Sequence, residues 1–317
     1  MAPVHLFSHG STMMLGEESA SASYWKKCGD EALANGIEHV VMMGAHWATT
    51  SPKSGILISA NPHPDKSPVA FVGPAKYKPY QLVPDLAFVP TIQRLLAAAG
   101  IPSAADPTFD WIHDTYLVLV RMFPDRCPPT TILSMNALFD PHLHVAVGAA
   151  LRPLRRRKTL FIGSGGAVHN LYRNVWGPML RYRDNFAQPT PPEPWALDFR
   201  QEVIDTFCAG HHHASSKTTS EEEARATTTT PPSYGEEIRS SPRGVGGPML
   251  RRKATSLMKH PRYRDAHATD DHFMAIMFVA GLCGAKDDVG IKGIMGAEDW
   301  ELTNMCNSQF TLGGWDD

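Results

Sequence analysis

Histidines at the ends of predicted strands are the residues of this sequence best suited to chemistry. His9 follows the short apolar run Val4–Ser8. His46 follows a second, almost continuously apolar run, Glu38–Gly44. A helix predicted over residues 19–35 joins these two strands as a βαβ unit, so both imidazoles are expected at the carboxyl edge of one parallel sheet. Neutral imidazoles at such an edge are suited to holding a divalent metal ion.

The candidates for a third ligand lie near the end of the chain. His272 directly precedes the apolar run Phe273–Leu282, which has the composition of a buried helix. Three imidazoles leave coordination positions of a divalent ion open for water or substrate. On spacing alone Asp270, Asp271 and His267 compete with His272 for this role, so the residues by themselves leave the third ligand open.

Two further histidines are candidate catalytic residues. His169 follows the glycine-rich break 163–166 at the end of a predicted strand. An unperturbed imidazole titrates near pH ~6.5, so His169 is predicted to act as a general acid or base, with a purely structural role in the turn as the alternative. His113, beside Asp114, is the second candidate and is expected close to the metal ligands.

Other histidines are predicted to be structural. His5 lies on the first strand with the same parity as His9 and is expected in the core, and His144 is expected in the first turn of a helix, as a structural residue or a pocket wall. The tract His211–His213 lies in a polar segment and is not a preferred metal site.

Composition excludes several classes of function. The chain has 317 residues, 43% of them hydrophobic and 20% charged, with a formal net charge of −2. This balance does not favour a nucleic-acid or membrane partner. The five cysteines form no CxxC pair, which indicates a reducing compartment, and we expect a cytoplasmic protein. The sequence contains no apolar run of about 20 residues and no signal-peptide pattern, and it gives no oligomeric state.

Strand and helix patterns alternate along the chain, which predicts an α/β fold. We expect one domain over residues 1–317, with a mostly parallel central sheet flanked by helices and the metal site at the carboxyl edge of its strands. Residues 209–253 contain few apolar side chains and are predicted to be a disordered insertion within that domain. Residues 61–80 are predicted to be a surface loop or lid. The other expected elements are strands over 55–59, 130–135, 158–162 and 306–312, and helices over 84–99, within 110–122, over 140–154 and over 273–282.

The motifs around these histidines together resemble the class III extradiol ring-cleavage dioxygenases, in particular their DOPA-dioxygenase-like branch. The matching segments cover most of the chain outside the predicted insertion. They are Ser8-His9-Gly10-Ser11, Ala45-His46-Trp47, the Gly-Ser-Gly-Gly-Ala-Val-His-Asn-Leu run over 163–171, Thr269-Asp270-Asp271-His272-Phe273, and the closing strand within 304–313. Two segments depart from the family pattern: Ile112-His113-Asp114 stands in place of Asp-His-Gly, and Asn61 is followed by Pro62-His63-Pro64-Asp65 in place of a Tyr-Asp-Phe-like motif.

The resemblance implies a mononuclear divalent metal centre with His9, His46 and His272 as ligands and His169 as the acid/base. It also implies a metal-dependent oxidoreductase that opens the ring of a catechol-type aromatic with O2 to give a semialdehyde. Fe(II) is expected for activity, because zinc has no redox chemistry, and Zn(II) is expected as a possible occupant of the same site. Two alternatives stay open: a zinc-dependent hydrolase or lyase that uses the same three histidines, and a binding protein on this fold without catalysis.

Overall fold

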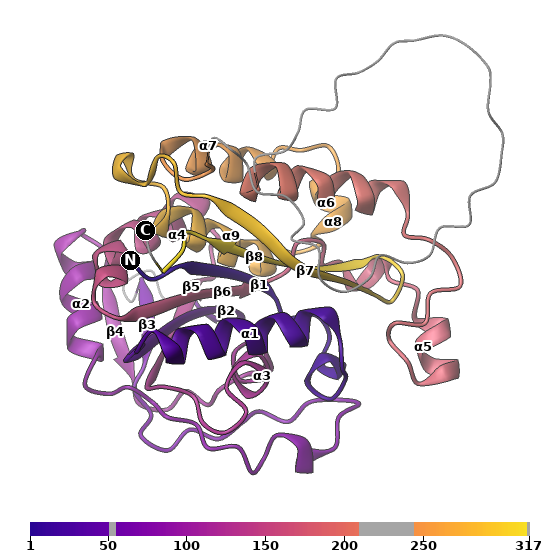
Figure 1. The fold of residues 1–317 in the computed structure, drawn as a ribbon, viewed down its shortest axis with the longest axis horizontal. Helices are drawn as coiled ribbons and strands as arrows, with labels where there is room; N and C mark the ends of the chain where they lie inside the picture. The colour runs from indigo at the N-terminus through magenta and orange to yellow at the C-terminus, as the bar shows by residue number, and fades with distance from the viewer. Residues whose placement is uncertain (51–54, 209–243, 316–317) are drawn as a thin grey trace, which may run out of the picture.

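The centre of the molecule is an eight-stranded sheet, seen edge-on in Figure 1. The computed structural model describes residues 1–50, 55–208 and 244–315. Across the sheet the strands follow the order β4-β3-β5-β2-β6-β1-β8-β7. Their bounds are β1 Val4–Ser8, β2 His39–Thr49, β3 Ile56–Ser59, β4 Ser103–Asp106, β5 Thr130–Asn136, β6 Thr159–Gly165, β7 Gly293–Glu301 and β8 Met305–Leu312.

The middle of the sheet is parallel. β5, β2, β6 and β1 pair in parallel with one another, with Met42 opposite Ile162 and His5 also opposite Ile162. β8 pairs antiparallel with both β1 and β7, and β3 pairs antiparallel with β5 and parallel with β4. The predicted α/β fold with a mostly parallel sheet is therefore confirmed. Because β1, β2 and β6 run in one direction, their carboxyl ends meet at the same edge.

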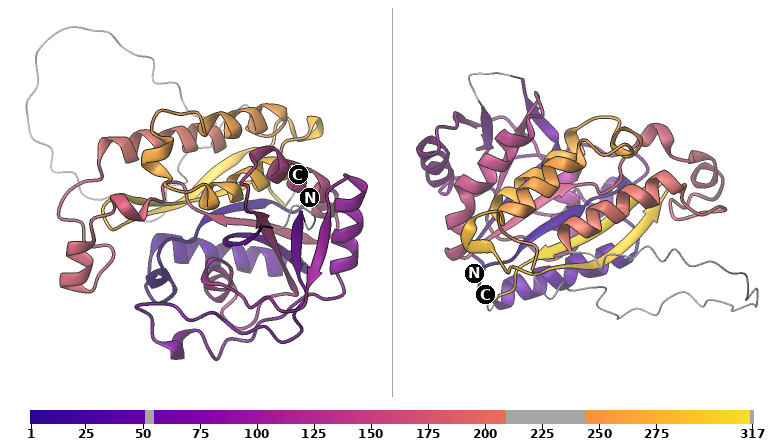
Figure 2. Two further views of the ribbon diagram at one scale, coloured as in Figure 1. Left: turned by 180° about the vertical axis from the view of Figure 1, so that it is seen from behind. Right: turned by 90° about the horizontal axis from the view of Figure 1, so that it is seen from above.

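Helices cover both faces of the sheet, as Figures 1 and 2 show. α1 and α3 pack on one face and α4, α6, α7 and α9 on the other, while α5 stands beyond the end of the sheet (Figure 1). The helix bounds are α1 Ala20–Ala34, α2 Val89–Ala98, α3 His113–Met122, α4 Pro141–Leu151, α5 Trp176–Tyr182, α6 Pro194–Phe207, α7 Pro248–Leu257, α8 Tyr263–Ala266 and α9 Asp271–Leu282.

Side chains of the central strands alternate between two hydrophobic layers. Val41 and Met43 of β2 pack into the layer under α4 and α9, whereas Val40 and Met42 pack into the layer under α1 and α3. This alternation follows from the period of two in a β-strand. Since both faces are covered, both sets are apolar, which explains the continuous apolar run in the sequence.

The helix α9 lies unusually close to β6. A Cβ atom at Gly165 would overlap the backbone carbonyl oxygen of His272 in the first turn of α9. A Cβ at Gly163 would approach the carbonyl oxygen of Ala275 to 2.7 Å. The two glycines therefore let the start of α9 sit directly against the carboxyl end of β6, and this contact places His272 at the edge where β1 and β2 end.

Several predicted bounds were wrong. β2 continues beyond Gly44 to Thr49, and its pairing with β5 is irregular between Met43 and Ala48, so His46 lies inside the strand. β6 extends through Gly165, which makes most of the predicted glycine turn part of a strand. α2 begins at Val89 instead of residue 84, because Pro84 and Asp85 pair with Thr130.

The end of the predicted insertion was also wrong. Residues 209–243 lie outside the described part of the chain, but residues 248–253 belong to α7. Leu250, Ala254 and Leu257 of this helix are buried in the hydrophobic layer between the sheet and the helices on the α9 side. The spacing of these three residues matches one face of a helix.

The described helices include none with the length and apolarity needed to cross a membrane.

Candidate metal centre

His9 lies immediately after β1, and its side chain is fully buried. Its Nδ1 atom is 3.2 Å from the Oγ atom of Ser164, and the Ser164 hydroxyl donates in turn to the backbone carbonyl of Asp114. Because the hydroxyl hydrogen is used on Asp114, Ser164 accepts from His9, and His9 carries its proton on Nδ1. The Nε2 lone pair is therefore free, and this buried atom has no hydrogen-bond partner in the described structure.

The turn after His9 is held by a buried carboxylate. Glu301, at the end of β7, accepts hydrogen bonds from the Ser11 amide at 2.8 Å and from the Ser11 hydroxyl. The side-chain amides of Asn185 and Asn307 also donate to it. Gly10 has a φ of +67°, and a Cβ there would overlap the Glu301 carboxylate. Burial raises the pKa of Glu301, and the donors around it oppose that shift.

His46 lies in the irregular stretch of β2, and Asp114 fixes the backbone there. The Asp114 carboxylate, buried at the start of α3, accepts from the backbone amides of Ala45 and His46 at 2.6 and 2.8 Å. A strand irregularity of this kind re-aims a side chain. Asp114 thus supports two histidines at once: His46 through its carboxylate and His9 through its carbonyl and Ser164.

His272 lies in the first turn of α9, and its side chain is buried. Its Nδ1 atom is 3.1 Å from an Asp271 carboxylate oxygen, which also accepts from the Thr269 hydroxyl at 2.7 Å. Burial opposes these interactions, but they lower the pKa of Asp271. The carboxylate orients the ring so that Nε2 is left without a partner among the described residues, as in His9.

The structure brings the five candidate site histidines into one cluster. The ring centroids of His9, His46 and His272 lie 5.4, 5.1 and 4.9 Å apart in pairs. His113 lies 4.6 Å from His46 and 5.8 Å from His9. His169 stacks on His272 at 3.6 Å and is 6.1 Å from His9.

Ligand atoms in this cluster are close enough to share one ion. Two sets have such atoms within 4.8 Å of one another: His9, His46 and His113, and His46, Asp271 and His272. Two buried Nε2 atoms without partners, on His9 and His272, are what an imidazole site for a divalent ion requires. The residues present therefore fit a metal centre.

The electrostatics of the cluster favour neutral imidazoles. Burial lowers the pKa of His9, His46, His113 and His169, and the neighbouring histidines lower the pKa values further. For His113 the pKa falls to about 4. Neutral imidazoles are the form that binds a metal ion, so the cluster is prepared for a cation without first losing protons.

A cavity of about 550 Å³ opens over the cluster. His46, His113, His169 and His272 line it. Its lining also includes the large apolar or aromatic side chains of Phe71, Leu171, Tyr172 and Trp176. A concave apolar site with a few polar groups is typical of a small-molecule site, and its volume is suited to an aromatic ligand with substituents.

His5 and His144 do not line this cavity. His5 is buried and bonds through Nδ1 to the Thr311 hydroxyl at 2.8 Å, as expected for a core residue. His144 accepts the Asn136 amide and donates to the Asp140 carbonyl, which confirms a structural role. The tract 211–213 lies outside the described residues.

Comparison with known proteins identifies the family. Residues 3–232 match the family model described as the catalytic LigB subunit of aromatic ring-opening dioxygenase. Over 213 residues the chain is 33% identical to a 4,5-DOPA dioxygenase extradiol of Portulaca grandiflora, covering 64% of this chain and 71% of that one. A protein of the same description from Escherichia coli K12 is 27% identical over 203 residues, 63% of this chain and 69% of the relative.

A solved structure shows the same fold. It is the crystal structure of an uncharacterized protein from Escherichia coli K12, which aligns over 99% of this chain and 100% of that chain with a TM-score of 0.67 and 20% sequence identity. The resemblance found in the motifs is thus confirmed by the family match. Members of this family bind a divalent metal and act on aromatic substrates with O2. The chain therefore belongs to the LigB family of aromatic ring-opening dioxygenases, and it is an oxidoreductase of the extradiol ring-cleaving type.

Proposed function

We propose that this protein opens the ring of a catechol with O2 to give a semialdehyde, at a divalent metal held by His9, His46 and His272. The observation that carries this proposal is the convergence of the three rings, whose centroids lie 4.9 to 5.4 Å apart. They come from the ends or edges of three different elements: β1, β2 and α9.

His272 is favoured over His113 as the third ligand. Both lie near His46, but His272 and His9 share a pattern that His113 lacks: an occupied Nδ1 and a buried Nε2 without a partner. A carboxylate or hydroxyl on the far nitrogen is the usual companion of a metal-bound imidazole. His113 is then left facing the cavity, where it can donate to or accept from a substrate oxygen.

His169 is proposed to move a proton of the substrate. Its ring is stacked on His272 and lines the cavity, and its Nδ1 is buried against Gly166, so Nε2 is the atom that faces the substrate. Burial and the neighbouring histidines lower the pKa of His169, which keeps the ring neutral and able to accept a phenolic proton. When bound, a divalent ion supplies a Lewis acid for the diol oxygens, and Fe(II) also supplies the electron chemistry that O2 requires.

Iron(II) is the proposed metal for activity, and zinc the proposed occupant that binds without turnover. Purified protein should be loaded with Fe(II) without air and mixed with a 4-substituted catechol and O2. We expect one O2 consumed for each ring opened and a yellow semialdehyde product. The zinc-loaded protein is the control and should be inactive. If no tested catechol consumes O2 in the Fe(II) form, the proposal is contradicted, and activity of the zinc form without O2 would indicate a hydrolase or lyase instead.

Two variants separate metal binding from proton transfer. His9→Ala should lose both the bound metal and the activity. His169→Ala should keep the metal but turn over about 10²- to 10⁴-fold more slowly, because only the acid/base group is removed. A His169→Ala protein that retains full kcat would contradict the role assigned to this residue.

A further inference from the structure

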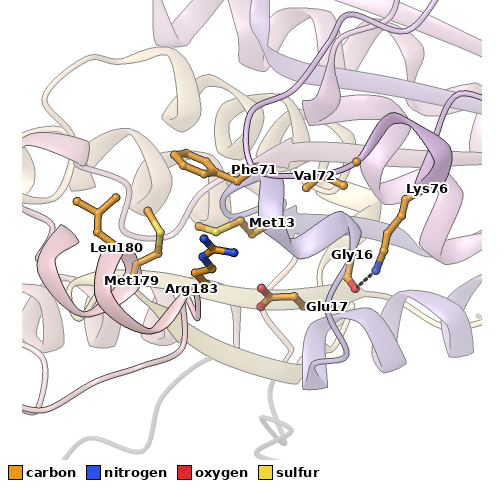
Figure 3. A pocket seen from close by; sticks show the side chains of 10 residues that line it. Met13, Gly16, Glu17, Phe71, Val72, Lys76, Met179, Leu180 and Arg183 are labelled. Atoms are coloured by element: carbon orange, nitrogen blue, oxygen red, sulfur yellow. Dashed lines mark hydrogen bonds between the residues drawn. The ribbon is translucent and has the colours of Figure 1, made fainter.

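A second chamber of about 410 Å³ lies beside the cavity over the histidines (Figure 3). Met13 and Phe71 line both spaces. The other walls are Met179 and Leu180 of α5 and Val72 of the 61–80 loop. The two spaces therefore meet at one pair of flexible side chains, close to the candidate metal ligands.

The chamber contains two cations and one carboxyl group. Arg183 follows α5 in a left-handed conformation (φ 56°), and its amide donates to the Met179 carbonyl at 2.7 Å. Its guanidinium has no ion-pair or hydrogen-bond partner within the described residues, and Figure 3 shows it between Met13 and Glu17. Lys76 donates to the Gly16 carbonyl at 3.0 Å and forms no ion pair in that same part of the chain.

The carboxyl group of the chamber is partly neutral near pH 7. Burial, followed by the nearby carboxylates of Asp184 and Glu301, raises the pKa of Glu17 to about 7, and Lys76 opposes this shift. With Glu17 half protonated and Arg183 and Lys76 charged, the chamber carries a net positive charge at or below this pH.

Building on the proposed function, we propose that this chamber binds the distal part of the substrate, and that the substrate is a catechol with an extended apolar arm that ends in a carboxylate. The catechol ring lies over the histidines, the arm passes Met13 and Phe71, and the carboxylate is bound by Arg183. Guanidinium groups pair with carboxylates through two parallel hydrogen bonds, which suits an unpaired arginine beside the apolar side chains of this chamber.

The size of the two spaces supports an extended substrate. A cavity of about 550 Å³ already falls in the range that encloses a drug-sized ligand, and the second chamber adds about 410 Å³. A bare catechol ring fills only a small part of this volume and would leave apolar walls in contact with water. Phe71 and Leu180 are both exposed in the free protein. A substrate arm that packs against them would remove their apolar surface from water.

The test uses pairs of 4-alkylcatechols whose arms end in a carboxylate or in the isosteric carboxamide. Binding to the zinc-loaded protein is measured by calorimetry without O2, and KM and kcat are measured with the Fe(II) form. We expect the wild-type protein to prefer the carboxylate, and Arg183→Gln to weaken binding of the carboxylate about five- to tenfold while changing binding of the carboxamide much less. The matched control is Arg181→Gln, because Arg181 lies in α5 two residues before Arg183, stacks on Tyr182 and does not line the chamber.

An equal effect of Arg183→Gln on both arms, no effect on either, or the same effect from Arg181→Gln would overturn the proposal. The calorimetric measurement tests binding in the chamber separately from ring opening. If catechols bind with the expected arm preference but are not oxidised, ring opening is contradicted and the chamber is supported. If simple catechols are oxidised and the arm has no influence, only the chamber proposal fails.

Discussion

At the scale of single residues, the centre depends on which ring nitrogen of each histidine is left free. His9 is fixed by Ser164 and His272 by Asp271, and both are left with an unpartnered Nε2. The hydroxyl of Ser164 can accept from His9 because its own hydrogen is donated to the carbonyl of Asp114. Such supporting groups set both the tautomer and the orientation of a ligand.

Removing the Ser164 hydroxyl should therefore weaken the metal site without removing a ligand. In Ser164→Ala, His9 can place its proton on either nitrogen, and we expect metal affinity to fall about 10- to 100-fold. Competition with a chelator in the zinc-loaded protein measures this change. Ser59→Ala is the matched control, because Ser59 is also buried but lies on β3, which β5 separates from β2, and accepts the Ile132 amide. Equal metal affinities for Ser164→Ala and the wild-type protein would contradict the role of Ser164.

The candidate ligand histidines could be predicted from the sequence, whereas the carboxylates that support them could not. His9 and His46 stand out in the sequence because each follows an apolar strand. Asp114 and Glu301 were not predicted to support the site. The sequence does not distinguish a buried acidic residue from a solvated one, and the partners of these carboxylates come from distant segments of the chain. Glu301 accepts from Ser11, 290 positions away in the chain.

At the scale of elements, the position of α9 against β6 decides whether His272 reaches the other ligands. The contact is possible because Gly165 has no side chain where the His272 carbonyl lies. α9 is buried on all sides, so it cannot move without disturbing both α4 and the sheet.

Gly165→Ala should destabilise the fold and weaken metal binding together. The added methyl group forces α9 away from β6, and overpacking of this kind costs about 1 to 3 kcal/mol in the free energy of unfolding. Urea denaturation and chelator competition measure the two effects. Gly177→Ala is the control, because a Cβ at this position in α5 meets no atom within 4 Å. A Gly165→Ala protein with unchanged stability and unchanged metal affinity would show that the contact is not required.

The success of sequence-based prediction differed between elements for physical reasons. β1, β5 and α1 were predicted almost to the residue, because the two strands have uninterrupted apolar patterns and α1 is capped by Ser19 and Asn35. β4 and β7 were missed. β4 is a short edge strand of sequence SAAD, and β7 contains glycine and acidic residues and is only partly buried, so neither has the composition of a buried strand.

At the scale of the whole molecule, the charge of the chamber is linked to stability. Folding raises the pKa of Glu17 from its ordinary value of 4.5 to about 7. Between these two pH values the folded protein holds a proton that the unfolded chain has released. The contribution of Glu17 to the free energy of unfolding therefore falls as pH rises through this window.

The variant Glu17→Gln should remove that contribution. We expect its stability to fall less between pH 5 and pH 8 than that of the wild-type protein, as measured by urea denaturation at both pH values. Glu18→Gln is the control, because Glu18 is the next residue in the chain, is exposed and forms an ion pair with Arg121. A pH dependence of Glu17→Gln identical to that of the wild-type protein would contradict the burial of this carboxyl group in its neutral form.

The central claim is that one divalent ion is held by His9, His46 and His272. Anomalous diffraction at the zinc absorption edge, from crystals of the zinc-loaded protein, tests it most directly. We predict a single strong peak within about 2.0 to 2.2 Å of one ring nitrogen of each of the three histidines, with Nε2 as the ligand atom of His9 and His272. A peak coordinated by His113 in place of His272, or no ordered ion in this cluster, would contradict the account.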